Sequence, residues 1–246
     1  MYEVIKNSTK QVLPRKYLLY GENLIRSIIF QFYKGDKFQC TVCEKKLRKF
    51  ISLLTNHDKL CPNCGSRSRD RRLWLMLRPF LLDNISVLHF SPARCLSKKL
   101  KNYPGIQYHT ADLKGKFPAD KKLDITNIEE PSGTFDMIIC YHVLEHIEDD
   151  KKAMQELNRV LRVGGKCFIQ TPFKKGMIYE DWDKRTSAAR KKHFGNRNHV
   201  RIYSVDGLKA RLQNTGFDVV ATKFVEKKDN YFGLQEEEYV VTGLKH

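Results

Sequence analysis

The pattern of apolar and polar residues is most regular between residues 134 and 172, where two short apolar runs flank a helical repeat. The run 137–140 is rich in strand-forming residues, which is typical of a strand buried on both faces. Asp149 or Asp150 is suited to begin a helix after it, and Gly164 is suited to end that helix. The helical repeat consists of Ala153, Met154, Leu157, Val160 and Leu161. With a second run at 166–170, the segment predicts two parallel strands joined by a right-handed helical crossover.

Further apolar runs extend this unit into a sheet. They predict strands at 86–90, 106–110, 217–224 and 239–244, and a helix at 205–215. Strands that alternate with helices indicate an α/β fold. Two amphipathic helices are expected nearer the amino terminus, the second capped by Ser68 or Asp70 and packed on the sheet as the first helix of the sheet domain. The apolar face of the first comprises Leu24, Ile25, Ile28, Ile29 and Phe32.

Four of the seven cysteines form two Cys-x-x-Cys pairs, Cys40 with Cys43 and Cys61 with Cys64. Each pair can direct two thiolates at one metal ion, and two pairs complete the tetrahedral site of a zinc ribbon. A disulfide or a redox-active dithiol fits less well, because nothing in the chain indicates an oxidising compartment. We therefore expect a structural Zn²⁺ ion, which would supply folding energy that this short polar segment lacks.

The segment from Phe135 through His142–His146 to Gly164–Gly165 resembles the second half of a class I S-adenosylmethionine-dependent methyltransferase. The likeness is closest to small-molecule and sugar methyltransferases and covers about residues 85–244. It implies a Rossmann-like doubly wound sheet, mostly parallel with an antiparallel last strand, preceded by the small four-cysteine zinc ribbon. The expected parts are a helical segment over 1–36, the ribbon over 37–68 and the methyltransferase domain over 69–246, with a lid over the substrate at 173–204.

The formal net charge of the 246 residues is +17 at pH 7. Strong positive charge favours an anionic partner such as nucleic acid, a nucleotide-linked substrate or a membrane surface. Because the basic residues are spread along the chain, a lysine-rich proteome explains the charge equally well. No apolar run approaches the roughly 20 residues of a membrane span, so no transmembrane segment is expected. Residues 1–10 lack the apolar core of a signal peptide, and we expect a cytoplasmic protein.

Several arginines follow the second cysteine pair, namely Arg67, Arg69, Arg71 and Arg72. They could bind phosphate groups. They could instead offset the negative charge of the tetrathiolate, which is the interpretation we favour. Ribbons of this layout precede methyltransferase domains in proteins that resemble bacterial polysaccharide-biosynthesis enzymes and also in some ribosomal RNA methyltransferases. The ribbon therefore does not choose between these substrates.

The resemblance assigns the cofactor S-adenosylmethionine to the carboxyl ends of the strands. The first turn, 90–94, lacks the usual glycine, although Ser91 and Ala93 are small enough for a close approach. Asp112 has the spacing of a ribose-binding acid, or it is an ordinary turn cap. Asp124 resembles the acid that meets the adenine amino group. The expected cofactor-binding residues are Phe90, Ser91, Pro92, Ala93, Asp112, Leu113, Asp124, Ile125, Tyr141 and His142.

A hydroxyl acceptor benefits from a general base, and histidine titrates in the right range. The candidates for the catalytic residue are His142, His146, His193 and His199. His142 is best placed for direct contact, whereas His146 could simply orient the turn. The insertion at 173–204 is long and rich in aromatic and polar residues, which predicts a functional lid rather than a solvated loop. Its expected substrate-binding residues are Tyr179, Arg201 and Tyr203, with Arg201 suited to clamp a phosphate or carboxylate.

These observations favour an O-methyltransferase that acts on a small or carbohydrate-like acceptor, including one that is linked to a nucleotide or lipid phosphate. An RNA methyltransferase is the alternative, in which the ribbon and the basic surface hold RNA. Its base-methylating forms often carry an Asn-Pro-Pro-Tyr-like turn where this chain has Cys140–Val143. A catalytically silent binding module is the third hypothesis, supported by the glycine-free turn.

Overall fold

The computed structural model describes residues 15–53, 58–115, 117–227 and 229–246. Its contacts divide the chain into two units. The smaller unit combines Met1–Pro79 with Glu226–Gln235, and the larger combines Phe80–Val225 with Glu236–His246. The first fourteen residues of the expected N-terminal helical segment lie outside the described residues. The expected boundary at residue 68 falls inside the smaller unit.

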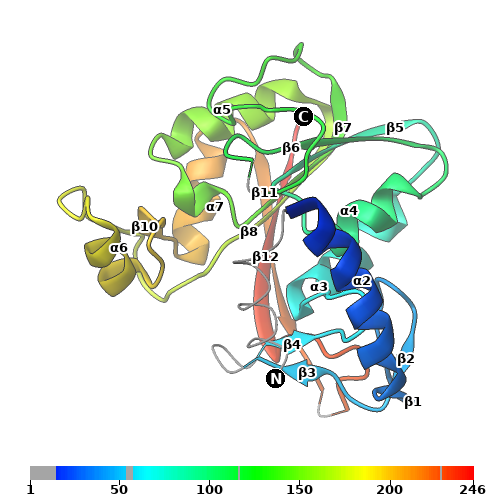
Figure 1. The fold of residues 1–246 in the computed structure, drawn as a ribbon. Coiled ribbons are helices and arrows are strands. Elements are labelled where there is room, and N and C mark those ends of the chain that lie inside the picture. Colours follow the sequence, from blue (N-terminus) through cyan, green and yellow to red (C-terminus); the bar gives the residue numbers. More distant parts are fainter. Residues whose placement is uncertain (1–14, 54–57, 116, 228) are drawn as a thin grey trace. The chain divides into compact units, whose positions relative to one another are not determined.

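A six-stranded sheet in the order β11-β12-β8-β7-β5-β6 forms the centre of the larger unit (Figure 1). Its strands are β5 (Ile85–Phe90), β6 (Ile106–Ala111), β7 (Phe135–Tyr141), β8 (Leu161–Gln170), β11 (Asp218–Val225) and β12 (Glu237–Leu244). The four strands β6, β5, β7 and β8 pair in parallel, and β12 is antiparallel to both of its neighbours. The expected mostly parallel α/β sheet with an antiparallel last strand is confirmed.

Helices cover both faces of this sheet. Helix α4 (Arg94–Lys101) joins β5 to β6, and α5 (Asp150–Val160) joins β7 to β8. These two steps run in opposite directions across the sheet, so right-handed crossovers place the two helices on opposite faces. Helix α7 (Val205–Gln213) contacts α5 and shares its face (Figure 1). The sheet is therefore doubly wound, as expected.

The region between β7 and β8 shows why the predicted element boundaries were partly wrong. The side chain of Asp149 caps α5 by accepting a hydrogen bond from the Lys152 N–H at 3.0 Å. The helix ends at Val160, however, and β8 begins directly at Leu161 rather than at residue 166. The early start follows from a β-bulge, because pairing with β7 shifts register between Phe135 and Met137.

Two glycines make that early start of β8 possible. Gly164 adopts a left-handed φ of +78°, which favours glycine. A Cβ at Gly165 would lie 2.9 Å from the carbonyl oxygen of Asp136 on β7. The glycine pair therefore forms an irregular part of the strand rather than the cap of a longer helix.

The core of the larger unit lies on both sides of its central strands. Along β7, the residues Met137–Tyr141 are all buried. Apolar residues of α5 and α7 pack against this strand. The helix residues include Met154, Leu157, Leu208 and Leu212. This two-sided burial explains why the strands are continuous apolar runs rather than alternating ones.

The smaller unit is built from short elements. Its helices are α2 (Arg15–Gln31) and α3 (Ser68–Leu77), and its strands are β1 (Lys34–Gln39), β2 (Lys46–Leu47), β3 (Ile51–Ser52) and β4 (Lys59–Leu60). The 3₁₀ helix η1 (Arg78–Phe80) follows α3. The strands form two separate antiparallel pairs, β1 with β2 and β3 with β4.

Several predictions for the smaller unit were wrong. Leu24, Ile28 and Phe32 of the expected apolar face of α2 are exposed. Contacts group α3 with the cysteines, not with the sheet domain. Arg67 is the N-cap of α3, and the Asp70 carboxylate accepts a hydrogen bond from its N–H at 2.8 Å.

The segment between β11 and β12 is a long connection between two antiparallel neighbours of the sheet. Residues 226–235 belong to the smaller unit, where the N–H of Gln39 donates to the carbonyl of Tyr231 at 3.1 Å. The chain therefore leaves the sheet domain after β11, contributes to the smaller unit, and returns as β12. No helix within the described ranges is long and apolar enough to cross a membrane.

Candidate functional site

Polar residues meet at the carboxyl ends of β6, β5 and β7. The strand registers pair Phe90 with Ala111 and with Cys140. Ser91 and Asp112 directly follow β5 and β6, and His142 directly follows Tyr141 at the end of β7, so the three residues lie beside one another at one edge of the sheet. The chain steps from β5 to β6 in one direction and from β7 to β8 in the other, which makes this edge a topological switch point, where open α/β sheets bind ligands.

The turn after β5 compensates for its lack of glycine. Ser91 has a φ of +48°, in the left-handed region that favours glycine. Its N–H donates to the carbonyl of Ala111 at 2.8 Å, and its hydroxyl donates to Oδ1 of Asp112 at 2.9 Å. Ser91 thus adopts the backbone conformation of a glycine turn while fixing the carboxylate on the neighbouring strand. Phe90 and Pro92 are buried beside it.

The two predicted cofactor acids lie in different surroundings. The Asp112 side chain is buried, and its Oδ2 also accepts a hydrogen bond from the N–H of Phe117 at 3.4 Å. Oδ1 of Asp124 accepts hydrogen bonds at 2.8 Å from both the N–H and the hydroxyl of Thr126, so one of its oxygens closes a local turn. Leu113 is exposed and Ile125 is part of the core.

His142 is held by a buried carboxylate that sequence reasoning missed. Its Nδ1 lies 3.1 Å from Oε1 of Glu145, in the short 3₁₀ helix η2 (Leu144–His146). The φ of His142 is +55°, and its N–H donates to the carbonyl of Gln170 on β8 at 2.8 Å. Burial on its own would raise the pKa of Glu145, but the hydrogen bond from His142 lowers it below its ordinary value. The i, i+3 spacing was the available signal for this pair.

The segment 173–204, which is the expected lid, brings a third histidine to this place. His199 is buried, and its Nε2 lies 3.9 Å from Oε1 of Glu145. Its ring meets that of His146 edge to face, with centroids 4.7 Å apart. Burial lowers the pKa of His199. Three of the four predicted histidines, His142, His146 and His199, therefore gather around Glu145.

The fourth histidine forms a separate pair. Within the lid, helix α6 (Ser187–Phe194) carries His193, and the strand β9 (Tyr179–Glu180) carries Tyr179. The Tyr179 hydroxyl and Nδ1 of His193 are 3.0 Å apart. Tyr179 and His193 were both expected in the site, and they contact each other within the lid.

Arg201 and Tyr203 do not have the surroundings expected of substrate-binding residues. Arg201, in β10 (Arg201–Ile202), is 1% exposed, and its guanidinium donates to Glu180 and to the carbonyls of Leu144, Ile147 and Glu148. Tyr203 is fully buried and donates its hydroxyl to Asp150. The acidic partners of both residues come from within the chain. Their contacts therefore indicate that they fasten the lid to the segment after β7.

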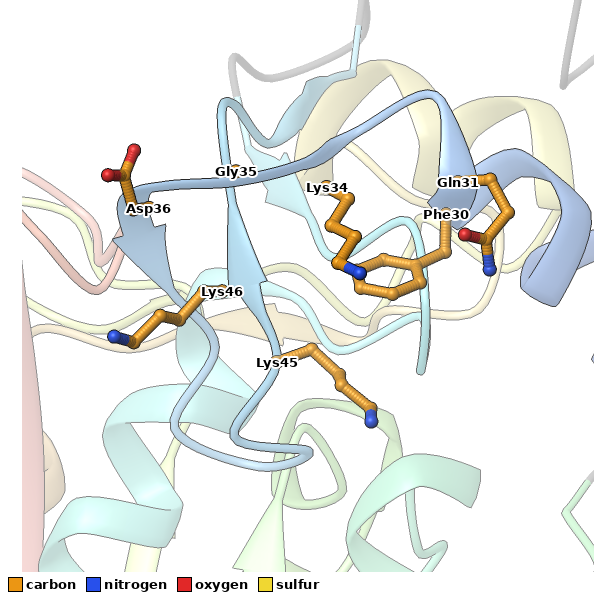
Figure 2. Close-up of a pocket in the computed structure, with 7 residues that line it drawn as sticks. All are labelled: Phe30, Gln31, Lys34, Gly35, Asp36, Lys45 and Lys46. Atoms are coloured by element: carbon orange, nitrogen blue, oxygen red, sulfur yellow. The ribbon is translucent and has the colours of Figure 1, made fainter.

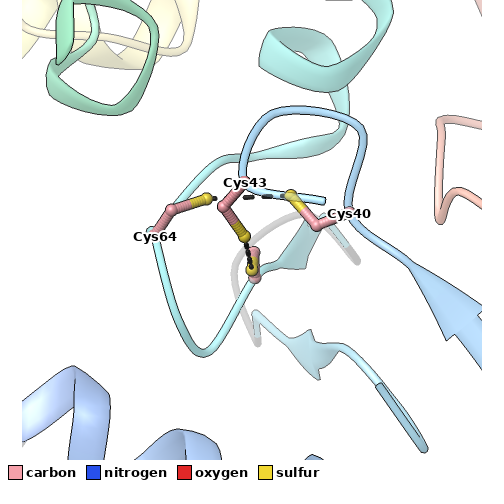
Figure 3. A group of neighbouring side chains, drawn as sticks. Cys40, Cys43 and Cys64 are labelled. Carbon is pink, nitrogen blue, oxygen red and sulfur yellow. Dashed lines mark hydrogen bonds between the residues drawn. The ribbon is translucent and has the colours of Figure 1, made fainter. Parts of the chain in front are cut away.

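The four cysteines of the smaller unit form one cluster (Figure 3). Sγ of Cys40 lies 3.7 Å from that of Cys64, and Sγ of Cys43 lies 3.7 Å from that of Cys61. These separations exclude a disulfide of about 2.05 Å. A tetrahedral zinc ion with bonds of about 2.3 Å would place its sulfurs about 3.8 Å apart, which matches the cluster.

Two of the four arginines that follow the second cysteine pair, Arg71 and Arg72, are buried and bind partners within the chain. Arg71 is fully buried; it donates to the carbonyls of Ser66, Lys59 and Phe232 at 2.7–2.8 Å. Arg72 pairs with Glu226. Because Ser66 Oγ is also 3.2 Å from Sγ of Cys40, the Arg71 charge lies close to the thiolates, in line with the charge-offset interpretation.

The smaller unit also contains a surface pocket between α2 and the β1–β2 pair (Figure 2). It is lined by Phe30, Gln31, Lys34, Gly35, Asp36, Lys45 and Lys46. None of the predicted catalytic or cofactor-binding residues lines it, so it lies outside the candidate site.

A family model described as Methyltransferase domain matches residues 67–222, which is more than half of the chain. The chain belongs to this methyltransferase family. It is an S-adenosylmethionine-dependent methyltransferase with a four-cysteine cluster in its N-terminal part. No curated protein matches this methyltransferase.

Solved structures share the fold of this methyltransferase at low sequence identity. The cyclase SpnF has a TM-score of 0.55 at 13% identity and matches over 80% of this chain and 88% of its own. Phosphoethanolamine N-methyltransferase 2 of Haemonchus contortus, solved with S-adenosyl-L-methionine, has a TM-score of 0.52 at 14% identity over 72% and 52%. The CurJ carbon methyltransferase has a TM-score of 0.50 at 16% identity over 70% and 52%. The methyltransferase thus spans about half the length of the latter two chains. None of the three names points to polysaccharide biosynthesis.

Proposed function

We propose that this methyltransferase transfers a methyl group to a hydroxyl of a small or carbohydrate-like acceptor. The observation that supports this most strongly is a histidine–carboxylate pair, His142 with Glu145, at the strand end beside the Ser91–Asp112 pair. The Ser91–Asp112 pair suits the ribose diol of the cofactor, and the His142–Glu145 pair suits a proton transfer. Their neighbouring strands would bring the two functions together.

The residues at the first two strand ends fit the cofactor. S-adenosylmethionine supplies a methyl group that is activated on a sulfonium sulfur. Asp112 would accept hydrogen bonds from the ribose hydroxyls, and the Ser91 hydroxyl keeps its carboxylate oriented. The other expected contacts are Phe90, Pro92, Ala93, Leu113, Asp124, Ile125, Tyr141 and His142.

His142 is the proposed general base. A carboxylate can only accept a hydrogen bond, so Nδ1 of His142 carries the hydrogen that is shared with Glu145. In the neutral ring, Nε2 then has the lone pair that would take the acceptor's proton. Glu145 would stabilise the imidazolium that forms. The left-handed backbone of His142 is a strain of the kind that clusters at functional sites.

The lid is proposed to bind the acceptor through the Tyr179–His193 pair. A surface hollow lies at α6, the helix that carries His193. It is lined by Lys191, Lys192 and Arg197, together with Ser187 and Ala188. Three cations around one hollow suit a phosphate, which supports an acceptor linked to a nucleotide or lipid phosphate. The same chemistry supports a role for the enzyme on activated sugars.

The four cysteines are proposed to bind a structural Zn²⁺ ion, because their sulfur separations match a tetrahedral site. RNA is less favoured as the substrate than the sequence alone indicates. Arg71 and Arg72 of the basic cluster are buried on partners within the chain and cannot reach a phosphate backbone without leaving them.

The test measures transfer of a labelled methyl group to a panel of sugar phosphates and to RNA, at low and high salt. We expect labelling of a sugar phosphate. In His142→Gln the rate should be lower by a factor of about 10² or more. His246→Gln is the matched control, because that exposed histidine also has a carboxylate partner, Asp218 at 3.3 Å. Labelling of RNA alone, with rates that fall steeply as salt rises, would contradict the proposal.

A further inference from the structure

The carboxylate of Glu145 is an unusual buried charge. Its residue is 1% exposed, and Oε1 accepts the hydrogen bond from His142. Oε2 is buried and accepts no hydrogen bond from any residue that the structure describes. No lysine or arginine of the described ranges forms an ion pair with it; its ion-pair neighbours are His142 and His199. Burial of a carboxylate is costly unless a cation compensates it.

Two neighbouring histidines are oriented as metal ligands would be. Nδ1 of His146 lies 2.9 Å from the carbonyl oxygen of Asn198, and Nδ1 of His199 lies 3.2 Å from that of Phe194. A carbonyl oxygen only accepts, so each Nδ1 must carry the hydrogen. In the neutral rings, each Nε2 then has a lone pair. Metal-binding histidines show this same arrangement, in which a backbone carbonyl fixes the tautomer.

The three side chains are close enough to share one ion. Potential ligand atoms of Glu145, His146 and His199 all lie within 4.8 Å of one another. A metal with bonds of about 2.1 Å places adjacent ligands roughly 3 Å apart, so modest side-chain rotations would complete the contacts. Two imidazoles and one carboxylate suit a divalent first-row transition metal.

We propose that Glu145, His146 and His199 bind one divalent transition-metal ion, separate from the ion of the four cysteines. Three protein ligands leave coordination positions open, and hydroxyl oxygens of the acceptor would occupy them. This second statement rests on the proposed function. The acceptor would then be a polyol with two neighbouring oxygens, and the metal would lower the pKa of the hydroxyl whose proton His142 receives.

The experiment titrates untagged, zinc-loaded protein with Mn²⁺ and follows the paramagnetic resonance signal of the free ion. Mn²⁺ is chosen because carboxylate and hydroxyl oxygens suit it, whereas thiolates prefer softer metals. We expect one site per chain, with affinity at least tenfold weaker in Glu145→Gln and in His199→Gln. His146 is only partly buried, so His146→Gln tests the same site with little risk to the fold. His246→Gln is the control and should bind Mn²⁺ as the unchanged protein does.

Titration with S-adenosylhomocysteine separates this inference from the proposed function. Binding of S-adenosylhomocysteine without saturable Mn²⁺ binding would overturn the metal site and leave the methyltransferase account intact. Mn²⁺ affinity that is equal in all four variants would also overturn it, because the ion would then bind elsewhere. Mn²⁺ binding that the three ligand variants weaken, in protein that fails to bind S-adenosylhomocysteine, would support the metal site and contradict the proposed function.

Discussion

Replacing Arg201 with lysine should destabilise the larger unit, although the substitution keeps the charge. The guanidinium spans Glu180 and three backbone carbonyls, those of Leu144, Ile147 and Glu148. A single ammonium on a flexible stem cannot meet four acceptors in that arrangement. At least two contacts should be lost. A hydrogen bond to a charged group contributes about 1.5 kcal/mol or more, so the expected cost is about 3 kcal/mol.

Arg162→Lys is the matched control. Arg162 also pairs with a carboxylate, because its Nη1 lies 2.9 Å from Oδ1 and 2.8 Å from Oδ2 of Asp136, but its side chain is 48% exposed. An exposed ion pair contributes about 1 kcal/mol or less. Urea unfolding followed by circular dichroism measures both variants. A change below about 1 kcal/mol for Arg201→Lys, or the same change in both variants, would refute the reasoning, because the buried contacts would then contribute nothing.

Three further predictions concern the cysteine cluster, its second turn and the lid. Cys43→Ser, or a strong chelator, should unfold the smaller unit, because zinc binding contributes about 10 kcal/mol or more in such modules; metal content and circular dichroism measure this. Gly65→Ala should destabilise the same unit by about 1–2 kcal/mol in thermal unfolding, since its φ is +75° and a Cβ would lie 2.8 Å from the Arg26 guanidinium. Burial alone would raise the pKa of Glu180, but hydrogen bonds from Arg211 and Arg201 lower it to about 2. The ionised Glu180 carboxylate therefore contributes up to about 3 kcal/mol to the free energy of unfolding. This contribution is complete above about pH 4.5 and is lost as the pH falls to about 2, so Glu180→Gln should flatten the pH dependence of unfolding between these two values.

The sheet was predictable because its strands are local patterns. The run at 137–140 is apolar on both faces, and the structure buries it on both faces. The start of β8 was not predictable, because the bulge against Phe135 arises from pairing between strands. The exposure of the apolar face of α2 was not predictable either, because an amphipathic pattern does not show which surface will cover it.

The candidate site was partly predictable for a similar reason. His142 follows a strand that the sequence identifies, so its place at the sheet edge could be expected. The pairing of His199 with Glu145 depends on the path of the lid, which has no periodic pattern. The predicted role of Arg201 in substrate binding shows the opposite difficulty. An arginine in an irregular segment resembles a ligand clamp until the fold shows that Glu180 of the same segment is its partner.

The most direct test of the account is calorimetric titration of the zinc-loaded protein with S-adenosylhomocysteine. Asp112→Asn removes the proposed ribose acceptor with little change in volume, and Asp206→Asn, at an exposed position in the first turn of α7, is the control. The account predicts one site per chain in the unchanged and control proteins and affinity at least tenfold weaker in Asp112→Asn. Folded protein that does not bind the ligand, or binding that Asp112→Asn leaves unchanged, would contradict a cofactor site at the ends of β5, β6 and β7.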